Sequence, residues 1–339
     1  MAIPSQKLSF EKPIYELEAQ LEQLRSQANS PEVRDEALRL QLGVAELTKK
    51  IYANLSAWET VEVARHPDRP KGIDYINMVF DEFVELHGDK LYGDDRTILT
   101  GFVRLDDFRA VVIAQNKGRN FKERQEANFG MAHPEGYHKA IEKMKLAAKF
   151  KLPVIVFIDT PGAYPGIESE ERGVGRSISD SMYEMALLKT PIVCVVIGEG
   201  GSGGACGIGL GNRVGMLRYA YYSVISPEGC AGILWKSGEY KDKAAEALKF
   251  TTPHLLEFGV IDDIIEEPIG GAHRDHRIMA LNLKKYLKAK LKELSKLSDD
   301  ELLTQRYERI RKIGVFLEES SSDAANAGTE TADASQSQS

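Results

Sequence analysis

Residues Ile192 to Gly207 read IVCVVIGEGGSGGACG, an uninterrupted apolar run that ends in a glycine-rich turn. A continuous apolar run without alternation is typical of a strand that is buried on both faces of a parallel sheet. The pattern also occurs earlier, because the apolar run Val154 to Ile158 leads into the turn DTPGAYPG. A lysine and a proline precede each run. Two such units predict an α/β fold of stacked right-handed βα units, with a ligand site beyond the carboxyl ends of the strands.

Helical segments flank these two units. At the N-terminus, residues 14–28 and 33–51 place apolar side chains three and four apart, on either side of a Ser-Pro helix start, which predicts a helical hairpin. Further elements are expected as a helix around residues 75–86, strands at 98–105, 108–115, 221–225 and in VIDDIIEEP, and helices from Pro134, over 241–250 and over 276–297. The predicted division is an N-terminal helical arm (1–60), one large α/β domain (61–317) and a disordered low-complexity tail (318–339).

The composition narrows the classes of protein to consider. The chain has 339 residues and a net charge of −7, which gives no electrostatic reason to expect nucleic-acid binding. No apolar run approaches the ~20 residues of a membrane-spanning helix, and the N-terminus has no apolar leader, so a cytoplasmic protein is expected. Cys194, Cys206 and Cys230 show no C-x-x-C spacing. Buried thiols are therefore expected, rather than a disulfide framework or a zinc ribbon.

The glycine-rich turn at residues 198–207 matches two known motifs, one for dinucleotide binding and one for a serine nucleophile. It contains G-x-G-x-x-G, but the acidic residue that a dinucleotide site needs about 20 positions later is missing. It also contains G-x-S-x-G, which would make Ser202 the nucleophile of a serine hydrolase. The competing interpretation makes Ser202 the N-cap of the following helix, and we favour it. Downstream residues that could complete a hydrolase triad are Asp262, Asp263, His273 and His276.

A third interpretation uses the backbone of the same turn. Glycines let a ligand approach the main chain, and a helix that starts near Gly204 offers N–H groups without partners at its positive end. Donors fixed in this way stabilise an oxyanion without any catalytic side chain. A crotonase-type hydratase or isomerase would instead need acidic side chains, of which Glu199 is the only one in the turn. A non-enzymatic scaffold would make no demand for five glycines.

Several long motifs resemble the carboxyltransferase α subunits of multi-subunit bacterial acetyl-CoA carboxylase. The resemblance covers roughly residues 8–316 and implies a crotonase-like (ClpP/crotonase) fold of repeated ββα units. It also implies transfer of a carboxyl group from carboxybiotin to acetyl-CoA, which forms malonyl-CoA for fatty acid biosynthesis. The motifs that carry it are FEKPIYELEAQL, HGDKLYGDDRTILTG (87–101), NFGMAHPEGYHKA (128–140), IDTPGAYPG (158–166), EERG (170–173), VIGEGGSGGA (196–205) and SVISPEGCAGILWK (223–236).

The resemblance also implies which residues form the site. Backbone amides of Gly203, Gly204 and Ala205 would hold the biotin ureido oxygen and stabilise the enolate that remains after CO2 leaves. That enolate would itself take the proton from acetyl-CoA, so no side-chain base is implied. Further residues of the biotin or substrate site would be Gly162, Ala163, Tyr164, Gly200, Gly201 and Ser202.

Two kinds of residue lie outside this implied site. Cys206 stands where the family usually has leucine and is expected to pack as a small apolar side chain. Lys117, Arg119 and Lys236 are interpreted as ordinary surface charges.

The implied partners follow from the same family. The α subunit would work in an α2β2 assembly with a β subunit that carries a zinc ribbon and most of the acyl-CoA site, so no metal is expected in this chain. The biotin carboxyl carrier protein would bring carboxybiotin. A separate biotin carboxylase, which uses ATP, would supply the carboxyl group.

Overall fold

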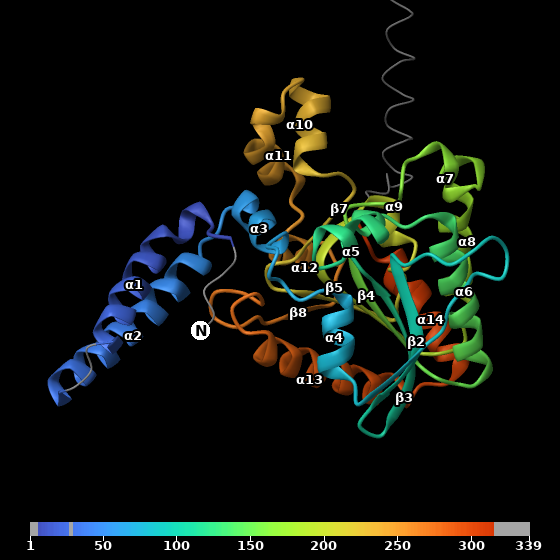
Figure 1. The fold of residues 1–339 in the computed structure, drawn as a ribbon. Coiled ribbons are helices and arrows are strands. Elements are labelled where there is room, and N and C mark those ends of the chain that lie inside the picture. Colours follow the sequence, from blue (N-terminus) through green and yellow to red (C-terminus); the bar gives the residue numbers. More distant parts are fainter. Residues whose placement is uncertain (1–5, 27–29, 315–339) are drawn as a thin grey trace, which may run out of the picture.

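The computed structural model describes residues 6–26 and 30–314. At the centre of the fold, β4 (Val154–Thr160) and β5 (Ile192–Gly201) lie side by side and pair in parallel (Figure 1). Every residue of both strands is buried, because the sheet is covered on both faces. The two apolar runs are therefore the parallel strands that the sequence predicts.

An antiparallel hairpin extends the sheet beyond β4. β3 (Phe108–Gln115) runs parallel to β4 and antiparallel to β2 (Ile98–Leu105), which pairs in turn with β1 (Glu82–Glu85). The strand β1 corrects the expectation of a helix up to residue 86, because α4 ends at Val79. The four residues of β1 add an edge strand to β2, and this pairing overrides their local preference.

On the other side of β5 the sheet continues with parallel strands. β6 (Arg213–Leu217) pairs with β5, and β8 (Asp263–Ile265) pairs with β6. β7 (Tyr221–Ser223) pairs with the last residues of β5, so that Glu199 lies opposite Tyr221. The parallel strands end at one edge of the sheet, which is where a ligand site is expected.

Helices cover both faces of the sheet. α6 (Pro134–Lys149) packs on β2 and β3 and contacts α8 (Val174–Leu187), whereas α4 (Gly72–Val79) and α13 (His276–Leu294) pack against each other on the opposite side. Residues of both layers and of the sheet belong to one buried apolar cluster.

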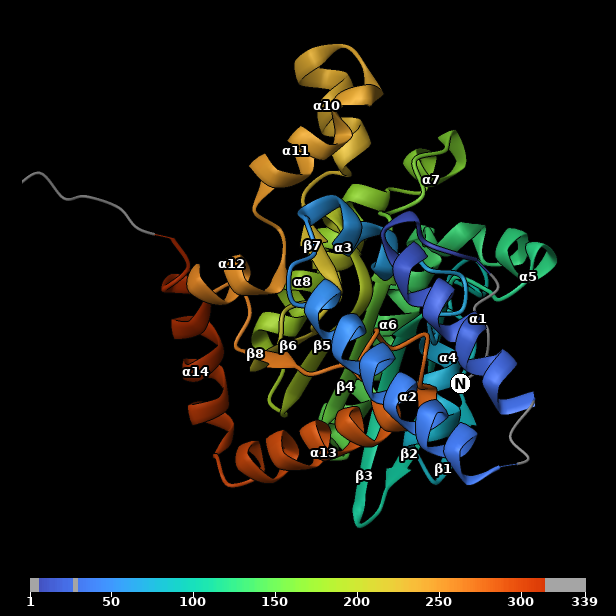
Figure 2. The same cartoon turned by 90° about the vertical axis from the view of Figure 1, so that its left-hand side faces the viewer.

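Shorter elements connect these layers. In Figures 1 and 2, α10 and α11 project from the same end of the molecule, near the carboxyl ends of the central strands. The remaining helices of the described residues are η1 (Ser9–Glu11), α3 (Ala57–Ala64), α5 (Phe121–Glu126), η2 (Asn128–Gly130), α7 (Ile167–Glu171), α9 (Ser202–Cys206), α10 (Pro227–Trp235), η3 (Gly238–Tyr240), α11 (Lys241–Leu248), α12 (Thr252–Glu257) and α14 (Asp299–Arg311).

The N-terminal arm is the helical hairpin that the sequence predicts. It consists of α1 (Lys12–Ser26) and α2 (Pro31–Tyr52), which project from the body of the molecule (Figure 1). Apolar side chains of the arm form a second cluster, to which Val63 of α3 and Tyr219 after β6 also contribute. The predicted boundary at residue 60 falls within α3, which contributes side chains to both apolar clusters. The predicted tail, 318–339, lies outside the described residues.

Candidate active site

The glycine-rich turn joins β5 to α9 without a loop. Gly201 is the N-cap residue, in an extended conformation, and no side chain caps the helix. The interpretation of Ser202 as the N-cap is therefore wrong. Gly201 still pairs with Ser223 of β7, which keeps its backbone extended up to the start of α9. Ser202 is the first helical residue and is exposed, with a φ of +50° that is uncommon for a residue other than glycine.

The two glycine-rich turns are in contact, as their places after neighbouring parallel strands predict. A Cβ atom on Gly201 would lie 2.3 Å from the carbonyl oxygen of Pro161. A Cβ atom on Gly204 would lie 2.4 Å from the carbonyl carbon of Gly162 and 2.5 Å from the nitrogen of Ala163. Main-chain atoms cannot make room cheaply, so both positions require glycine. The first turn of α9 thus lies directly against the turn after β4.

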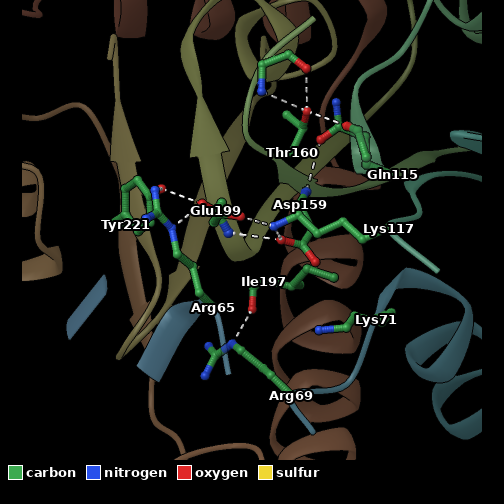
Figure 3. Close-up of polar contacts among 12 residues, drawn as sticks. Arg65, Arg69, Lys71, Gln115, Lys117, Asp159, Thr160, Ile197, Glu199 and Tyr221 are labelled. Atoms are coloured by element: carbon green, nitrogen blue, oxygen red, sulfur yellow. Dashed lines mark hydrogen bonds and ion pairs between the residues drawn. The ribbon is translucent and has the colours of Figure 1, made fainter. Parts of the chain in front are cut away.

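The turn after β4 is fixed by local hydrogen bonds. The amide of Gly162 donates to the hydroxyl of Thr160 at 3.0 Å (Figure 3). The amide of Tyr164 donates to the carbonyl of Ala132 at 3.0 Å, and the Tyr164 ring lies 4.4 Å from the ring of His133. Gly162, Ala163 and Tyr164 are all partly exposed, so this turn forms an accessible wall beside α9.

The first turn of α9 offers backbone donors. The first N–H groups of any helix have no acceptor within the helix, and in α9 these include the amides of Gly203 and Gly204. Ala205 is the fourth residue of α9, where an N–H group ordinarily begins to find an acceptor inside the helix. Gly203 is partly exposed, whereas Gly204 and Ala205 are buried. The arrangement can bind an oxygen atom that carries negative charge.

A buried polar network joins the carboxyl ends of β4 and β5 (Figure 3). The ammonium of Lys117, after β3, lies 2.7 Å from Asp159 of β4 and also contacts Glu199 of β5. Glu199 further binds Arg65, with 2.7 Å between Nε and Oε1, and accepts a hydrogen bond of 2.5 Å from the hydroxyl of Tyr221. The network therefore holds together the carboxyl ends of β3, β4 and β5, next to the glycine-rich turns.

This network keeps Glu199 ionised. Burial alone would raise the pKa of this carboxyl group, but Lys117, Arg65 and the hydroxyl of Tyr221 together lower the pKa to about 2. A carboxylate that is ion-paired on two sides and has so low a pKa is a poor proton donor near neutral pH. The one acid of the turn is thus unsuited to the general acid chemistry of a hydratase.

Lys117 lies in the candidate site, and its interpretation as an ordinary surface charge is wrong. Its side chain is only 12% exposed and bridges two carboxylates. The two acidic partners come from strands that follow 42 and 82 positions later, so no local pattern reveals them. The available signal is its place two residues after Gln115, the end of β3, at the same sheet edge as both glycine-rich turns.

The candidate hydrolase residues are not assembled around Ser202. The carboxylates of Asp262 and Asp263 are each held by a basic side chain, at 2.7 and 2.9 Å. His273 stacks on another histidine ring, with 4.1 Å between centroids. The Nε2 atom of His276 lies 2.7 Å from the backbone carbonyl oxygen of Asp68. In the part of the chain that the structure describes, no hydrogen bond joins Ser202 to any of these side chains.

An apolar cavity of about 380 Å³ opens beside α9. Cys206 lines it and is partly buried, with its Sγ 3.5 Å from the hydroxyl of Tyr222. The expectation of buried thiols is confirmed for Cys194 and Cys230. Other residues that line the cavity include Ser202, Val224, Leu248, Leu255, Arg309 and Ile313.

Metal-binding clusters and membrane-spanning helices are both missing from residues 6–26 and 30–314. No cluster of three or more histidine, cysteine, aspartate or glutamate side chains is arranged to bind a metal ion in this part of the chain. None of its helices has the length and apolar character needed to span a membrane.

Comparison with known sequences identifies the family. The model of the family described as acetyl co-enzyme A carboxylase carboxyltransferase-like matches residues 7–314. A protein of Rhodopirellula baltica is 59% identical over 314 residues, which cover 92% of this chain and 98% of the relative. A protein of Pasteurella multocida is 54% identical over 310 residues, which cover 91% and 98%. Both relatives are named acetyl-coenzyme A carboxylase carboxyl transferase subunit alpha.

Solved structures with lower identity share the fold. The transcarboxylase 12S structure with methylmalonyl-coenzyme A has a TM-score of 0.52 at 20% identity and covers 65% of this chain and 42% of that chain. The β subunit of Pseudomonas aeruginosa geranyl-CoA carboxylase has a TM-score of 0.53 at 18% identity and covers 71% and 46%. These likenesses confirm the crotonase-like α/β fold. The chain belongs to the family of acetyl-coenzyme A carboxylase carboxyltransferase α subunits, and it is a transferase subunit.

Proposed function

We propose that this chain and a β subunit together transfer the carboxyl group of carboxybiotin to acetyl-CoA, and that the amides of α9 form the oxyanion site. Membership of the family supports the reaction class. The observation that carries the site is the contact between the two glycine-rich turns, which places the amides of Gly203 and Gly204 beside the wall formed by residues 162–164. The donors of this site are backbone groups.

The first turn of α9 leaves room for a ligand oxygen to reach the main chain. A Cβ atom on Gly203 would meet only Ile178, at 3.5 Å, so the first turn of α9 is open above Gly203. A Cβ atom on Gly200 would lie 2.7 Å from the ring of Tyr222, so the end of β5 is closely packed at Gly200. There is therefore room for a ligand beside Gly203 and none beside Gly200.

Each part of the site has a distinct task in this proposal. When bound, carboxybiotin supplies an activated carboxyl group. The N–H groups of Gly203, Gly204 and Ala205 stabilise negative charge on the ureido oxygen, and one such donor contributes about 3 kcal/mol. Residues that shape the approach or line the wall are Gly162, Ala163, Tyr164, Gly200, Gly201 and Ser202. The proposal assigns no proton transfer to a side chain of this chain.

The proposed assembly is an α2β2 complex in the cytoplasm. The β subunit would supply a zinc ribbon and most of the acetyl-CoA site. The biotin carboxyl carrier protein would present carboxybiotin, after a biotin carboxylase has charged it at the expense of ATP. The word alpha in the names of the relatives supports the β partner. The net charge of −7 favours no nucleic-acid partner.

A direct test measures carboxyl transfer from malonyl-CoA to biocytin, which is the reverse reaction. The chain is assayed alone and after mixing with the β subunit. Transfer in the mixture, but not by the chain alone, is expected because the proposal places the acyl-CoA site largely on the partner. Ester hydrolysis by the isolated chain, with no transfer in the mixture, would contradict the proposal and favour a hydrolase.

A further inference from the structure

We infer that Gln115 is a positioning residue that sets the direction of the backbone donors in α9. Gln115 ends β3 and is fully buried, so it touches no ligand of the site. Its side-chain amide nitrogen donates a hydrogen bond of 2.9 Å to the carbonyl oxygen of Gly204. This inference rests on the proposed function, because it concerns the amides that the proposal makes the oxyanion site.

Gln115 gives the Gly204 carbonyl the hydrogen-bond donor that α9 itself does not provide. In a regular helix, each carbonyl accepts from the amide four residues later. The Gly203 carbonyl has such a bond, since Gly207 donates to it at 2.9 Å. The amide of Ile208, four residues after Gly204, instead donates to the Ala205 carbonyl at 3.3 Å, because α9 has ended. Gln115 therefore takes the place of the next turn of the helix.

Both ends of the Gln115 amide are fixed. Its Oε1 accepts a hydrogen bond of 2.9 Å from the backbone N–H of Asp159, at the end of β4 (Figure 3). A backbone N–H can only donate and a carbonyl can only accept, so one orientation of the amide satisfies Asp159 and Gly204 together. Gln115 thus ties the end of β4 to α9. The hydroxyl of Tyr137 lies at 3.4 Å from the same carbonyl and makes at most a weak second bond.

The hydrogen bond to the Gly204 carbonyl also fixes the orientation of the N–H group in the same peptide unit. The peptide unit is planar and trans, so the position of the Gly204 oxygen fixes the plane that carries the N–H of Ala205. In a helix the carbonyls point towards the C-terminus and the N–H groups towards the N-terminus. Gln115 therefore fixes, through this peptide unit, the orientation of the Ala205 amide, which is the third donor of the proposed oxyanion site. Small misplacements of such donors cost about 100-fold in rate.

The test removes one buried hydrogen-bond donor at a time, Gln115 or Thr100, in the complex with the β subunit. Gln115→Met keeps the size of the side chain but cannot donate to Gly204. Thr100→Val is the matched control, because Thr100 of β2 is also fully buried and its hydroxyl donates to the Leu86 carbonyl at 2.5 Å, outside the site. Transfer from malonyl-CoA to biocytin is measured for both variants, with rates expressed per assembled complex.

We expect Gln115→Met to lower kcat about 10- to 100-fold, with the KM for malonyl-CoA unchanged within about twofold, because an oxyanion donor acts in the transition state. Thr100→Val should keep kcat within about twofold of wild type. A Gln115→Met complex with wild-type kcat, or an equal loss in Thr100→Val, overturns the inference. A wild-type complex without transfer activity overturns the proposed function as well, so the two failures are distinguishable.

A second variant decides the matter if Gln115→Met does not assemble. Gln115→Glu has the same shape and still accepts from Asp159, but it can donate to Gly204 only when protonated. The charged groups around this position are Asp159 and Lys117, which pair at 2.7 Å, Glu199, which shares Lys117, and the buried Lys71, whose neighbour Gly72 packs on Gln115. The kcat of Gln115→Glu relative to wild type should therefore be higher at about pH 6 than at about pH 8. A ratio that is low and independent of pH overturns the inference, since a purely structural defect would not respond to protonation.

Discussion

Ser202 shows how the surroundings of a single residue decide its chemistry. It is exposed at a strand-to-helix turn with a φ of +50°, which is the kind of place where a hydrolase holds its nucleophile. A serine hydroxyl becomes a nucleophile only when a base lies within hydrogen-bonding distance. In the described structure the nearby groups are the glycines of the turn and an apolar cavity, and the candidate histidines lie elsewhere.

Replacement of Ser202 by alanine therefore separates two chemistries at the residue scale. In the complex with the β subunit, Ser202→Ala should lower carboxyl transfer by no more than about threefold, because the proposed donors are backbone amides of residues 203–205, which the change leaves in place. Loss of a true nucleophile would reduce the rate by about a thousandfold or more. The measurement is kcat for transfer to biocytin, and an inactive Ser202→Ala complex that still assembles would contradict the oxyanion account.

At the scale of elements, the site depends on how the ends of three strands are joined. Lys117 after β3, Asp159 of β4 and Glu199 of β5 form one buried ionic cluster. Removing one partner from a buried ion pair leaves an uncompensated charge, which costs far more than loss of an exposed pair. Removing a single member of the cluster should therefore weaken this edge of the sheet.

Lys117→Met should lower the free energy of unfolding by about 3–5 kcal/mol, because it leaves two buried carboxylates without their shared cation. Lys90→Met is a suitable control, since the side chain of Lys90 is 73% exposed and pairs with Glu142 at 2.8 Å. That change should cost less than about 1 kcal/mol. Urea denaturation measures the free energy of unfolding of both variants. Equal losses in the two variants would show that the buried cluster matters no more to stability than an exposed ion pair.

The same elements show what the sequence could and could not predict. The strands β4 and β5 follow from uninterrupted apolar runs, and their common edge follows from the parallel arrangement. The predicted N-cap at Ser202 is wrong because the preference of serine for N-caps is local, whereas the pairing of Gly201 with β7 is not. The short strand β1 was missed for a similar reason, since only its partner β2 makes residues 82–85 extended.

In the molecule as a whole, hydrogen bonds between distant segments attach the N-terminal arm to the large domain. Glu11, next to the N-terminal arm, is fully buried and accepts a hydrogen bond of 2.9 Å from Arg274, which lies 263 residues away. Tyr52 at the end of α2 donates to the same carboxylate at 2.8 Å. The sequence predicts the two helices of the arm but not this attachment, because no repeat or motif links the two ends of the chain.

If backbone amides of α9, and not a side chain, stabilise the transition state, then kcat of Gly204→Ala in the complex with the β subunit should fall sharply. The added methyl group would lie 2.4 Å from the main chain of Gly162 and must push the two turns apart. We predict a loss of about 100-fold or more per assembled complex. Gly43→Ala in α2 is the control, because a Cβ atom there meets nothing within 4 Å. It should leave kcat unchanged, and a Gly204→Ala complex as active as this control would contradict the account.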